Sequence, residues 1–557
     1  MNGSELILKA FEEEGVDIIF GYPGGSLIPF FDALYDNKNI KCVLTRHEQG
    51  AVHAADGYAR ATGKVGVCIA TSGPGATNLV TGIATANMDS IPLVAITGQV
   101  RTNLIGNDAF QEADVTGITR PISKHNYLVK DIKDLPVILK QAFHIATTGR
   151  PGPVVIDLPV DISMAETKED YPKTVEMRSY NPKSDGHKLQ IKKTIELIEK
   201  SKKPVIYAGG GVIISEACKE LTEFANKTGI PVTTTLMGLG CFPEDNELSL
   251  GMLGMHGTFY ANYAVTDCDL LISIGSRFDD RVTGKISEFA PHAKIIHIDI
   301  DPSSISKNVK VDLPIVGDAK KVLKSLIEIA VKGDYKDWHD QINQWKKEYP
   351  LSYDKKADEI KPQFVMEKIN ELTDGNAIIV TEVGQSQMWA AQFFTYVKPR
   401  TYISSGGLGT MGFGFPAAIG VQLGCPDKVV FDISGDGSFQ MNLQELSTAV
   451  EQKLPIKIII LNNGCLGMVR QWQELFYGKR YSKTILNCNP DFVKLAEAYG
   501  AQGIKVEKPD EVEGALKKAL AVKDGPIILD IKIPFEENVF PMVPAGAAIN
   551  RMIGGMA

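Results

Sequence analysis

The sequence predicts an α/β protein made of three doubly wound parallel-sheet domains. Its 557 residues are enough for three or four domains of about 150 residues each. Short apolar segments typical of buried strands alternate with segments of helical periodicity. Two polar stretches divide this alternation into three series, which we expect to be domains over residues 1–165, 189–335 and 365–535.

The first series opens with "MNGSELILKAFEEEGVDIIF", whose charged residues and missing cleavage site favour a helix and a strand over a signal peptide. Strands are expected in "IKCVLT", "KVGVCIA", "IPLVAIT" and "GPVVIDLP", with helical segments such as "GAVHAADGYARATG" between them. Residues 166–188 lose this periodicity and gain charge, proline and serine, so they are expected to be a linker.

The second series contains the apolar segments "KPVIYAGGG", "CDLLISIG" and "AKIIHIDID". Residues 336–364 then predict a surface helix and a second linker. The third series contains "AIIVTEVGQ", "KVVFDISGDGSF", "IKIIILNN" and "PIILDIKIP", and its rhythm is like that of the first without a residue-level repeat. Residues 536–557 are rich in Gly, Ala, Pro and Met, which predicts a mobile tail or lid.

Composition excludes several classes of protein. The net charge is -8 and the lysines are spread thinly, which argues against nucleic-acid binding. No apolar run reaches the roughly 18 residues of a membrane span. Eight scattered cysteines without a CxxC pair argue against a zinc site and a disulfide framework. The missing signal peptide favours the cytoplasm.

Two glycine-rich motifs follow neighbouring strands of the third series. "GDGS" (435–438) ends one strand and "NNGCLG" (462–467) ends the next, so both should lie at the same edge of a parallel sheet. Asn442 and Glu445 are expected to cap the helix that lies between the two motifs. Either motif alone could be a tight turn. Together an Asp, an amide oxygen and a helix amino terminus predict Mg²⁺ holding a diphosphate.

This pattern resembles the motif of thiamine-diphosphate enzymes, which begins with GDG and ends with NN. The resemblance implies that Asp436, Asn463 and the backbone carbonyl of Cys465 hold Mg²⁺. It also implies that Glu48 activates the aminopyrimidine ring, although an acid at that position could simply favour a helix start. The residues implied to bind thiamine diphosphate are Glu48, Val383, Gly384, Gln385, Gly409, Met411, Gly435, Asp436, Gly437, Ser438, Asn463, Leu466, Gly467 and Met468.

Further segments resemble the acetohydroxyacid synthase family over roughly residues 1–550. They include "RHEQGAVHAADGYARATG", "GNDAFQEAD", "GSRFDDRVTG" and "LGMVRQWQELFY", in this order. The family decarboxylates pyruvate on thiamine diphosphate and adds the hydroxyethyl carbanion to pyruvate or 2-ketobutyrate, which starts branched-chain amino-acid synthesis. The resemblance implies a homodimer or tetramer, in which the first domain of one chain meets the third domain of another. It also allows a separate small regulatory subunit.

The resemblance assigns roles around the substrates. Gly25, Phe110 and Gln111 are expected to lie with Glu48 at the reacting centre, and Met411 to hold the cofactor bent. Arg281, Trp472 and Met255 are expected to bind the acceptor, because a guanidinium suits a carboxylate. From the sequence alone Met411 could be a core residue. Trp472 could be one too, since it shares helical spacing with Met468 and Leu475.

The middle domain lacks a GxGxxG, and its "AGGGV" is a weak signal. The family nevertheless implies FAD without a redox role. The residues implied for FAD are Arg150, Gly209, Gly210, Thr235, Leu236, Met237, His256, Gly275, Arg277, Asp279, Asp299 and Asp318. Val160 and Arg101 stand where many members carry Lys and Pro, so channel packing and herbicide response stay open.

Three alternative functions remain from the sequence. A pyruvate oxidase would share both cofactors, but "RFDDR" and "MVRQW" argue against it. A simple 2-keto acid decarboxylase would be expected to carry paired histidines in its first domain. A non-catalytic partner would be expected to have lost one of Glu48, Asp436 and Asn463. The sequence leaves open the organism, the acceptor preference, dimer or tetramer, and the need for a regulatory subunit.

Overall fold

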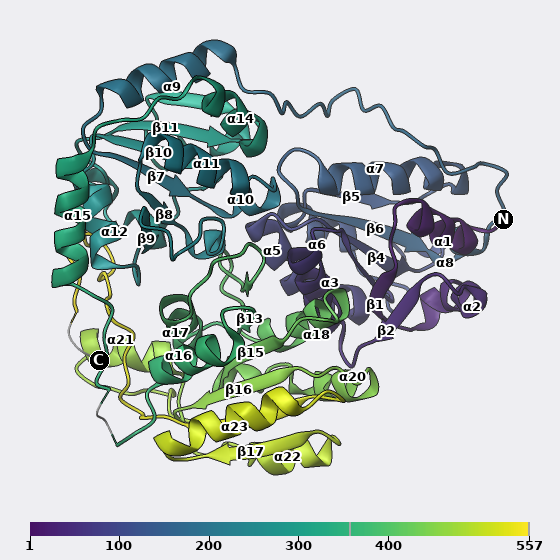
Figure 1. Ribbon diagram of the computed structural model, residues 1–557. Helices are drawn as coiled ribbons and strands as arrows, with labels where there is room; N and C mark the ends of the chain where they lie inside the picture. Colours follow the sequence, from purple (N-terminus) through teal and green to yellow (C-terminus); the bar gives the residue numbers. More distant parts are fainter. Residues whose placement is uncertain (356–357, 555–557) are drawn as a thin grey trace.

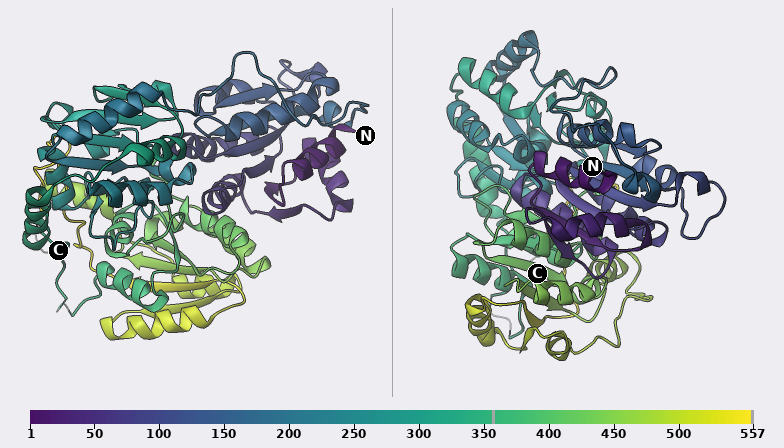
Figure 2. Two further views of the ribbon diagram at one scale, coloured as in Figure 1. Left: turned by 45° about the horizontal axis from the view of Figure 1, so that its top comes forward. Right: turned by 90° about the vertical axis from the view of Figure 1, so that its right-hand side faces the viewer.

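The protein is described by a computed structural model over residues 1–355 and 358–554 (Figure 1). Its strands form three six-stranded sheets in which the named strands pair in parallel. The three sheets lie in separate bodies around the middle of the molecule (Figures 1 and 2). The predicted fold class, three parallel α/β domains, is therefore confirmed.

The first sheet has the order β2-β1-β3-β4-β6-β5. Its strands are β1 (Ile18–Tyr22), β2 (Lys41–Leu44), β3 (Gly66–Ala70), β4 (Leu93–Gln99), β5 (His125–Leu128) and β6 (Pro153–Pro159). The main helices around it are α1 (Gly3–Glu13), α2 (Ile28–Asp36), α3 (Glu48–Thr62), α5 (Val80–Asp89) and α7 (Leu135–Thr147). Its apolar core lies largely between the sheet and the helices α1 and α7.

The third sheet has the order β14-β13-β15-β16-β18-β17. Its strands are β13 (Ile378–Thr381), β14 (Tyr402–Ile403), β15 (Val430–Gly435), β16 (Lys457–Asn462), β17 (Gln502–Val506) and β18 (Ile527–Lys532). Its main helices are α16 (Pro362–Thr373), α17 (Gln385–Phe393), α18 (Gly414–Gly424), α20 (Leu446–Glu451), α21 (Gly467–Phe476), α22 (Phe492–Ala498) and α23 (Pro509–Ala521). Numbered within its own domain, this order equals that of the first sheet, which explains the shared rhythm of the two sequences.

The middle sheet has the order β12-β11-β10-β7-β8-β9, so its order reverses between β7 and β10. The strands are β7 (Pro204–Ala208), β8 (Val232–Thr234), β9 (Ser249–Met252), β10 (Leu270–Ile274), β11 (Lys294–Asp299) and β12 (Leu313–Val316). Its main helices are α9 (Lys188–Lys200), α10 (Gly210–Ile214), α11 (Cys218–Thr228), α12 (Phe259–Asp267) and α14 (Ala319–Ile329). Ligands of such sheets bind outside the carboxyl ends of the strands at the reversal point.

The segments between and after the domains differ in part from expectation. Helix α15 (Lys336–Glu348) buries Trp338 and Ile342 in the core of the middle domain, so it is more than a surface helix in a linker. Residues 356–357 of that range, and 555–557 of the expected tail, lie outside the described residues. The described part of the tail is packed rather than free, because Val539 and Met542 are buried. The exact domain boundaries stay predictions.

Helices α3 and α18 join the first and third domains by a close crossing. A Cβ added at Gly57 would lie 2.2 Å from the carbonyl oxygen of Ala417, and one at Gly420 would lie 1.8 Å from that of Ala54. Both positions therefore need glycine if the two helix backbones are to touch. Across the described parts of the chain, we find no helix with the length and apolarity needed to cross a membrane.

Candidate active site

A small pocket of about 40 Å³ lies where the third sheet reverses its order, between β13 and β15. Strand ends at such a point carry the ligand in parallel α/β sheets. Twelve residues predicted for thiamine diphosphate or its metal line the pocket. They are Val383, Gly384, Gln385, Met411, Gly435, Asp436, Gly437, Ser438, Asn463, Cys465, Leu466 and Gly467.

Asp436 is the carboxylate of this pocket. Burial raises its pKa to about 6, while the amide of Asn489 donates to its Oδ2 over 2.5 Å and opposes that rise. Its Oδ1 is buried and has no hydrogen-bond partner within residues 1–355 and 358–554. A buried carboxylate oxygen left in this state is costly unless a ligand pairs with it. The site therefore fits a cation at Oδ1.

Asn463 lies in the same pocket as Asp436, as the motif spacing predicts. Its Oδ1 accepts from the backbone N–H of Cys465 over 3.1 Å, and its Nδ2 donates to Oε1 of Gln385 over 3.3 Å. These bonds fix which end of the amide carries the oxygen. They orient the oxygen of Asn463 on the Cys465 side of the pocket.

Glu48 and Gln111, two of the predicted reacting-centre residues of the first domain, lie close to residues 71–75, which follow β3. The Oε2 of Glu48 accepts from Asn78 Nδ2 over 2.9 Å, and its Oε1 lies 3.3 Å from a Cβ built on Gly75. Gln111 lies next to Gly73 and has a φ of 59°, an uncommon value for a residue with a side chain. These residues occupy the same topological position in the first domain as the small pocket does in the third.

Gly25 and Phe110 are the other two residues predicted for the reacting centre, and both have open space around them. A Cβ on Gly25 would meet no heavy atom of the described chain within 4 Å, and the Phe110 side chain is 88% exposed. Glu48, Gln111 and these two residues lie outside the small pocket within a single chain. One chain therefore presents the two predicted halves of the site at different places.

Glu445 has a different structural role from the helix cap that the sequence predicts. Asn442 and Glu445 do not cap the helix with their side chains in the described structure. Instead the carboxylate of Glu445 accepts from the backbone N–H groups of Arg46 and His47, each bond being about 3.0 Å. It therefore anchors the segment immediately before Glu48 to the third domain. The helical pattern could not reveal this contact, which spans the domains.

A large cavity of about 1720 Å³ lies at the reversal point of the middle sheet. Eleven of the twelve residues predicted for FAD line it; Gly209, the exception, precedes Gly210 at the end of β7. A Cβ at Gly209 would lie 2.3 Å from the carbonyl oxygen of Gly275, so the two strand-end loops touch there. The ends of β7, β10 and β11 therefore form one wall of the cavity, and residues of the first and third domains line other parts of it.

His256 connects this cavity to the end of the chain. Burial lowers its pKa to about 4, so its ring is neutral at pH 7. Its Nδ1 is 3.1 Å from the carbonyl oxygen of Pro541. A neutral ring donates through one nitrogen, and this contact makes Nδ1 the donor.

Arg281 and Trp472 face each other on the wall of the same cavity. The guanidinium carbon lies 5.8 Å from the centre of the indole ring. Within the described chain, the Arg281 side chain has only its sequence neighbour Asp280 as an ion pair, at 3.8 Å. Met255 is held beside it, because its N–H donates to the carbonyl oxygen of Arg281 over 2.8 Å. A cation and an apolar surface are thus presented together, and Trp472 is not simply a core residue.

The two cavities adjoin along the chain. Gly409 and Met468, predicted for thiamine diphosphate, line the large cavity, while Met411 and Gly467 line the small pocket. The loop 404–411 and the first turn of α21 therefore form a wall between them. Arg101 and Val160 line neither cavity in the described structure, so their influence on a substrate channel stays a prediction.

Comparisons with known proteins agree with this geometry. Three family models match: the N-terminal TPP binding domain of thiamine pyrophosphate enzymes at residues 1–118, their central domain at 191–326, and their C-terminal TPP binding domain at 382–531. The "Probable acetolactate synthase large subunit" of Methanocaldococcus jannaschii is 56% identical over 99% of this chain and 95% of that protein. The "Acetolactate synthase large subunit" of Haemophilus influenzae is 51% identical over 99% of this chain and 98% of that protein. The chain belongs to the acetolactate synthase large-subunit family.

A third relative supports the same assignment. The "Acetolactate synthase isozyme 3 large subunit" of Escherichia coli is 49% identical over 99% of this chain and 98% of that protein. The chain is therefore a thiamine-diphosphate-dependent enzyme of the acetolactate synthase family, which is what the motif order predicted.

Several residues of this acetolactate synthase site had no signal in the sequence. Asn489 bonds Asp436 from 53 positions away, and Asn78 bonds Glu48 from 30 positions away. Asn489 lies in a loop and Asn78 ends the short helix α4 (Pro74–Asn78), and neither belongs to a periodic pattern or motif that would mark it. Gln471 was also missed: its Oε1 accepts from Gln385 over 2.9 Å, and its Nε2 donates to the carbonyl of Val539 in the tail segment.

Proposed function

We propose that this chain condenses two 2-keto acids. Pyruvate loses CO2, and its two-carbon unit joins either pyruvate, giving 2-acetolactate, or 2-ketobutyrate, giving 2-aceto-2-hydroxybutyrate. The observation that carries this proposal is the Arg281 and Trp472 pair on the wall next to the small pocket. Arg281 suits the carboxylate of an acceptor and Trp472 its alkyl chain. A decarboxylase without an acceptor would need neither.

The small pocket is proposed to hold the diphosphate end of thiamine diphosphate together with Mg²⁺. Thiamine diphosphate supplies the nucleophilic carbon on which a 2-keto acid can be decarboxylated. Asp436 through its unpaired Oδ1, the amide oxygen of Asn463 and the carbonyl of Cys465 would hold the metal. No three His, Cys, Asp or Glu side chains of the described chain converge as a metal cluster, so the diphosphate oxygens would be needed to complete the coordination.

Glu48 is proposed to hold a proton at the aminopyrimidine ring from the opposite side. Because Glu48 lies outside the small pocket of its own chain, a second copy would have to supply it. The 88% exposure of Phe110 supports the same proposal, since a large apolar side chain at a reacting centre needs cover. We therefore propose a homodimer, or a tetramer built from it, with each site between two chains.

FAD is proposed for the large cavity, without a redox role. Its residues fit a long phosphorylated ligand: Gly210 begins helix α10 at a strand end, and Arg150 and Arg277 provide cations. The carboxylates of Asp299 and Asp318 are acceptors suited to hydroxyl groups. We also propose a separate regulatory subunit, because the relatives are named as large subunits. A cytoplasmic location is proposed as well.

The proposal is tested by product analysis. Purified chain is incubated with pyruvate, thiamine diphosphate, Mg²⁺ and FAD, with and without 2-ketobutyrate, while oxygen uptake is recorded. We expect acetolactate without stoichiometric oxygen loss, and acetohydroxybutyrate when 2-ketobutyrate is added. Acetate with oxygen uptake would make the chain a pyruvate oxidase, and acetaldehyde alone would make it a decarboxylase.

The shared site is tested by complementation. Chains with Glu48→Gln and chains with Asp436→Asn are each expected to be nearly inactive. In a mixed dimer one site pairs the intact Glu48 of one chain with the intact Asp436 of the other. After unfolding and refolding of an equal mixture, about a quarter of native activity should return, because half the dimers are mixed and each has one intact site. Failure of activity to return would contradict a site shared between chains.

A further inference from the structure

One loop separates the large cavity from the small pocket. Residues 405–409 line the large cavity, and Met411, two residues further on, lines the small pocket. The loop 404–411 follows strand β14 of the third domain. Any shift of the loop would therefore change the walls of both cavities.

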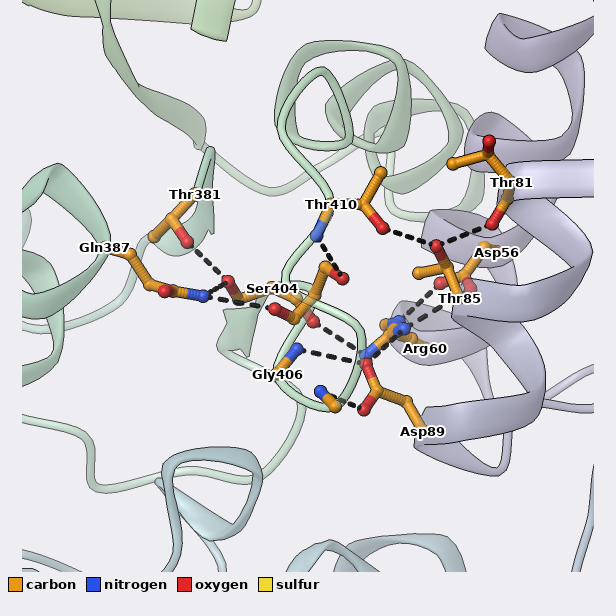
Figure 3. Close-up of polar contacts among 12 residues, drawn as sticks. Asp56, Arg60, Thr81, Thr85, Asp89, Thr381, Gln387, Ser404, Gly406 and Thr410 are labelled. Carbon is orange, nitrogen blue, oxygen red and sulfur yellow. Dashed lines mark hydrogen bonds and ion pairs between the residues drawn. The ribbon is translucent and has the colours of Figure 1, made fainter. Parts of the chain in front are cut away.

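Asp89, at the end of helix α5 of the first domain, holds this loop from the side (Figure 3). Its Oδ1 accepts from the N–H of Gly407 over 2.7 Å, and its Oδ2 accepts from the N–H of Gly406 over 3.1 Å. The side chain is only 1% exposed, although Asp89 also lines the large cavity. Two charge-assisted bonds from one carboxylate fix both the position and the orientation of a loop.

Arg60 connects Asp89 to helix α3, which begins at Glu48. Its guanidinium lies 3.0 Å from Asp89, donates to the carbonyl of Ser404 over 2.8 Å, and pairs with Asp56 one turn earlier. Figure 3 shows the guanidinium between the two carboxylates. The cluster has two carboxylates and one cation, and the N–H groups of Gly406 and Gly407 offset the remaining negative charge. A buried cluster of this kind depends on every partner being in place.

The same loop also lies against residues expected to contact FAD. A Cβ on Gly406 would lie 2.4 Å from the sulfur of Met237, and one on Gly407 would lie 3.0 Å from a guanidinium nitrogen of Arg277. The loop is therefore in close contact with both Asp89 and two residues expected to contact FAD. A ligand that presses on or orders this wall would act on the loop directly.

We propose that Asp89 is a positioning residue that couples the two cavities, so that filling the large cavity with FAD raises the affinity of the small pocket for thiamine diphosphate. This inference rests on the proposed function, because it needs both cofactors in their proposed places. It gives FAD a task in a reaction without redox chemistry. FAD would hold residues 405–409 at the cavity wall while Asp89 holds them through the N–H groups of Gly406 and Gly407, and Met411 would thereby be fixed.

The test measures the coupling itself, as the dissociation constant of thiamine diphosphate with Mg²⁺ by calorimetry, in full-length chain with and without saturating FAD. In the native chain FAD should tighten binding by at least about fivefold, the lower end of typical coupling between sites. Asp89→Asn should reduce this ratio to below about twofold, because an amide has one oxygen and presents two N–H groups toward donors. By reciprocity, thiamine diphosphate should tighten FAD binding by the same ratio in the native chain only.

Thr85→Val is the matched control. Thr85 Oγ1 is 2.7 Å from Thr410 Oγ1, so this variant also removes a buried bond between α5 and the same loop, but it leaves Asp89, Gly406 and Gly407 intact. It should keep the native coupling. Equal loss in Thr85→Val and Asp89→Asn would mean that general loosening of the domain contact, and not Asp89, is responsible, and would overturn the proposal.

Gly407→Ala tests the same contact without removing a charge. Its new Cβ would lie 2.7 Å from Asp89 Oδ1, so the loop and the carboxylate must move apart. It should lose coupling as Asp89→Asn does, which matters if Asp89→Asn fails to fold. Gly514→Ala is its control, because a Cβ there meets no atom within 4 Å in the described chain. Full coupling in a folded Gly407→Ala or Asp89→Asn chain, or none in the native chain, would overturn the inference. No FAD binding by the native chain would refute the flavin part of the proposed function itself.

Discussion

The guanidinium of Arg281 lies over the ring of Trp472, with 5.8 Å between its carbon and the ring centre. The contact comes from two domains, since Arg281 belongs to α13 (Asp280–Thr283) of the middle domain and Trp472 to α21 of the third. The indole Nε1 is buried and has no hydrogen-bond partner in the part of the chain that the structure describes. The pair is in cation–π contact, which leaves the donors of the guanidinium available to a ligand.

Arg281→Gln is expected to weaken the reaction of the second keto acid more than that of the first. Hydrogen bonds to a charged group contribute about 1.5–3 kcal/mol, so kcat/KM for the acceptor should fall at least roughly tenfold. Acetolactate formation at varied pyruvate and acetohydroxybutyrate formation at varied 2-ketobutyrate measure this. Arg480→Gln, at an exposed arginine, is the control. An unchanged acceptor KM in Arg281→Gln would contradict the assignment.

Trp472→Leu should change the choice of acceptor. The indole offers an apolar surface on the cavity wall, and one extra methylene in an apolar pocket is worth about 1–3 kcal/mol of discrimination. The ratio of acetohydroxybutyrate to acetolactate, measured with both acceptors present, should therefore fall several-fold. Phe476→Leu, at the partly exposed ring beside it, is the control and should keep the ratio. If Trp472→Leu left the ratio of acetohydroxybutyrate to acetolactate unchanged, Trp472 would serve only in packing.

Glu48→Gln should keep thiamine diphosphate binding and lose turnover. The glutamine can still accept from Asn78, which now bonds Glu48 Oε2 over 2.9 Å, so the local structure is preserved. Loss of a positioned acid–base group costs about 10²–10⁴ in rate. Calorimetry measures binding and product formation measures turnover. Glu328→Gln, an exposed change on α14, is the control, and native-like turnover in Glu48→Gln would remove Glu48 from the reaction.

The small pocket could be predicted from the sequence because its residues follow neighbouring strands. Asp436 and Asn463 come directly after β15 and β16, and parallel pairing of these strands brings their carboxyl ends together. The Arg60 and Asp89 cluster could not be predicted in this way. It joins α3, α5 and a loop more than 300 positions later, and a buried arginine on a helix looks the same in the sequence as an exposed one.

The large cavity of the middle domain is intermediate in how far the sequence predicts it. The twelve residues implied for FAD belong to no motif of their own, so only the resemblance to the family identified them. Eleven of these twelve residues nevertheless line one cavity. Helix α15 shows the opposite error, because a polar stretch hid Trp338 and Ile342, which pack into the middle domain. Mean polarity describes the exposed face of a helix, and one apolar stripe is enough to bury the other face.

Asp436 should make the stability of the cofactor-free chain depend on pH. Burial raises its pKa from the usual 3.8 to about 6, so between about pH 4 and pH 6 the folded chain holds a proton that the unfolded chain has lost. The contribution of Asp436 to the free energy of unfolding therefore falls as pH rises through that range and stays low above pH 6. Asp436→Asn removes the titration, so its Tm should exceed the native Tm at pH 7 by more than at pH 5.

Binding completes this test of Asp436. Asp436→Asn should lose the Mg²⁺ dependence of thiamine diphosphate binding, because the neutral amide replaces the one carboxylate expected to hold the metal. In the native chain Mg²⁺-dependent binding should weaken below pH 6, since the ion must displace the proton. Asp491→Asn, at a helix cap where both residues serve equally, is the control. Binding that is independent of pH and metal would contradict the site.

The crossing of α3 and α18 should be the least tolerant contact between the first and third domains. Gly420→Ala would place a Cβ 1.8 Å from the carbonyl oxygen of Ala54, which the two backbones cannot absorb without moving apart. Overpacking of this kind costs about 1–3 kcal/mol of unfolding free energy. Since α3 begins at Glu48, its displacement should also lower turnover. Urea unfolding and product formation measure the two effects.

Gly514→Ala is the control for this crossing. It changes glycine to alanine within α23, where a Cβ meets no atom of the described chain within 4 Å, and helix propensity alone should raise stability by up to about 1 kcal/mol. The two variants should therefore shift the urea midpoint in opposite directions. If Gly420→Ala also raised the urea midpoint, the two helix backbones would not be in contact. The expectation that a shift of α18 displaces Glu48 through α3 would then be wrong.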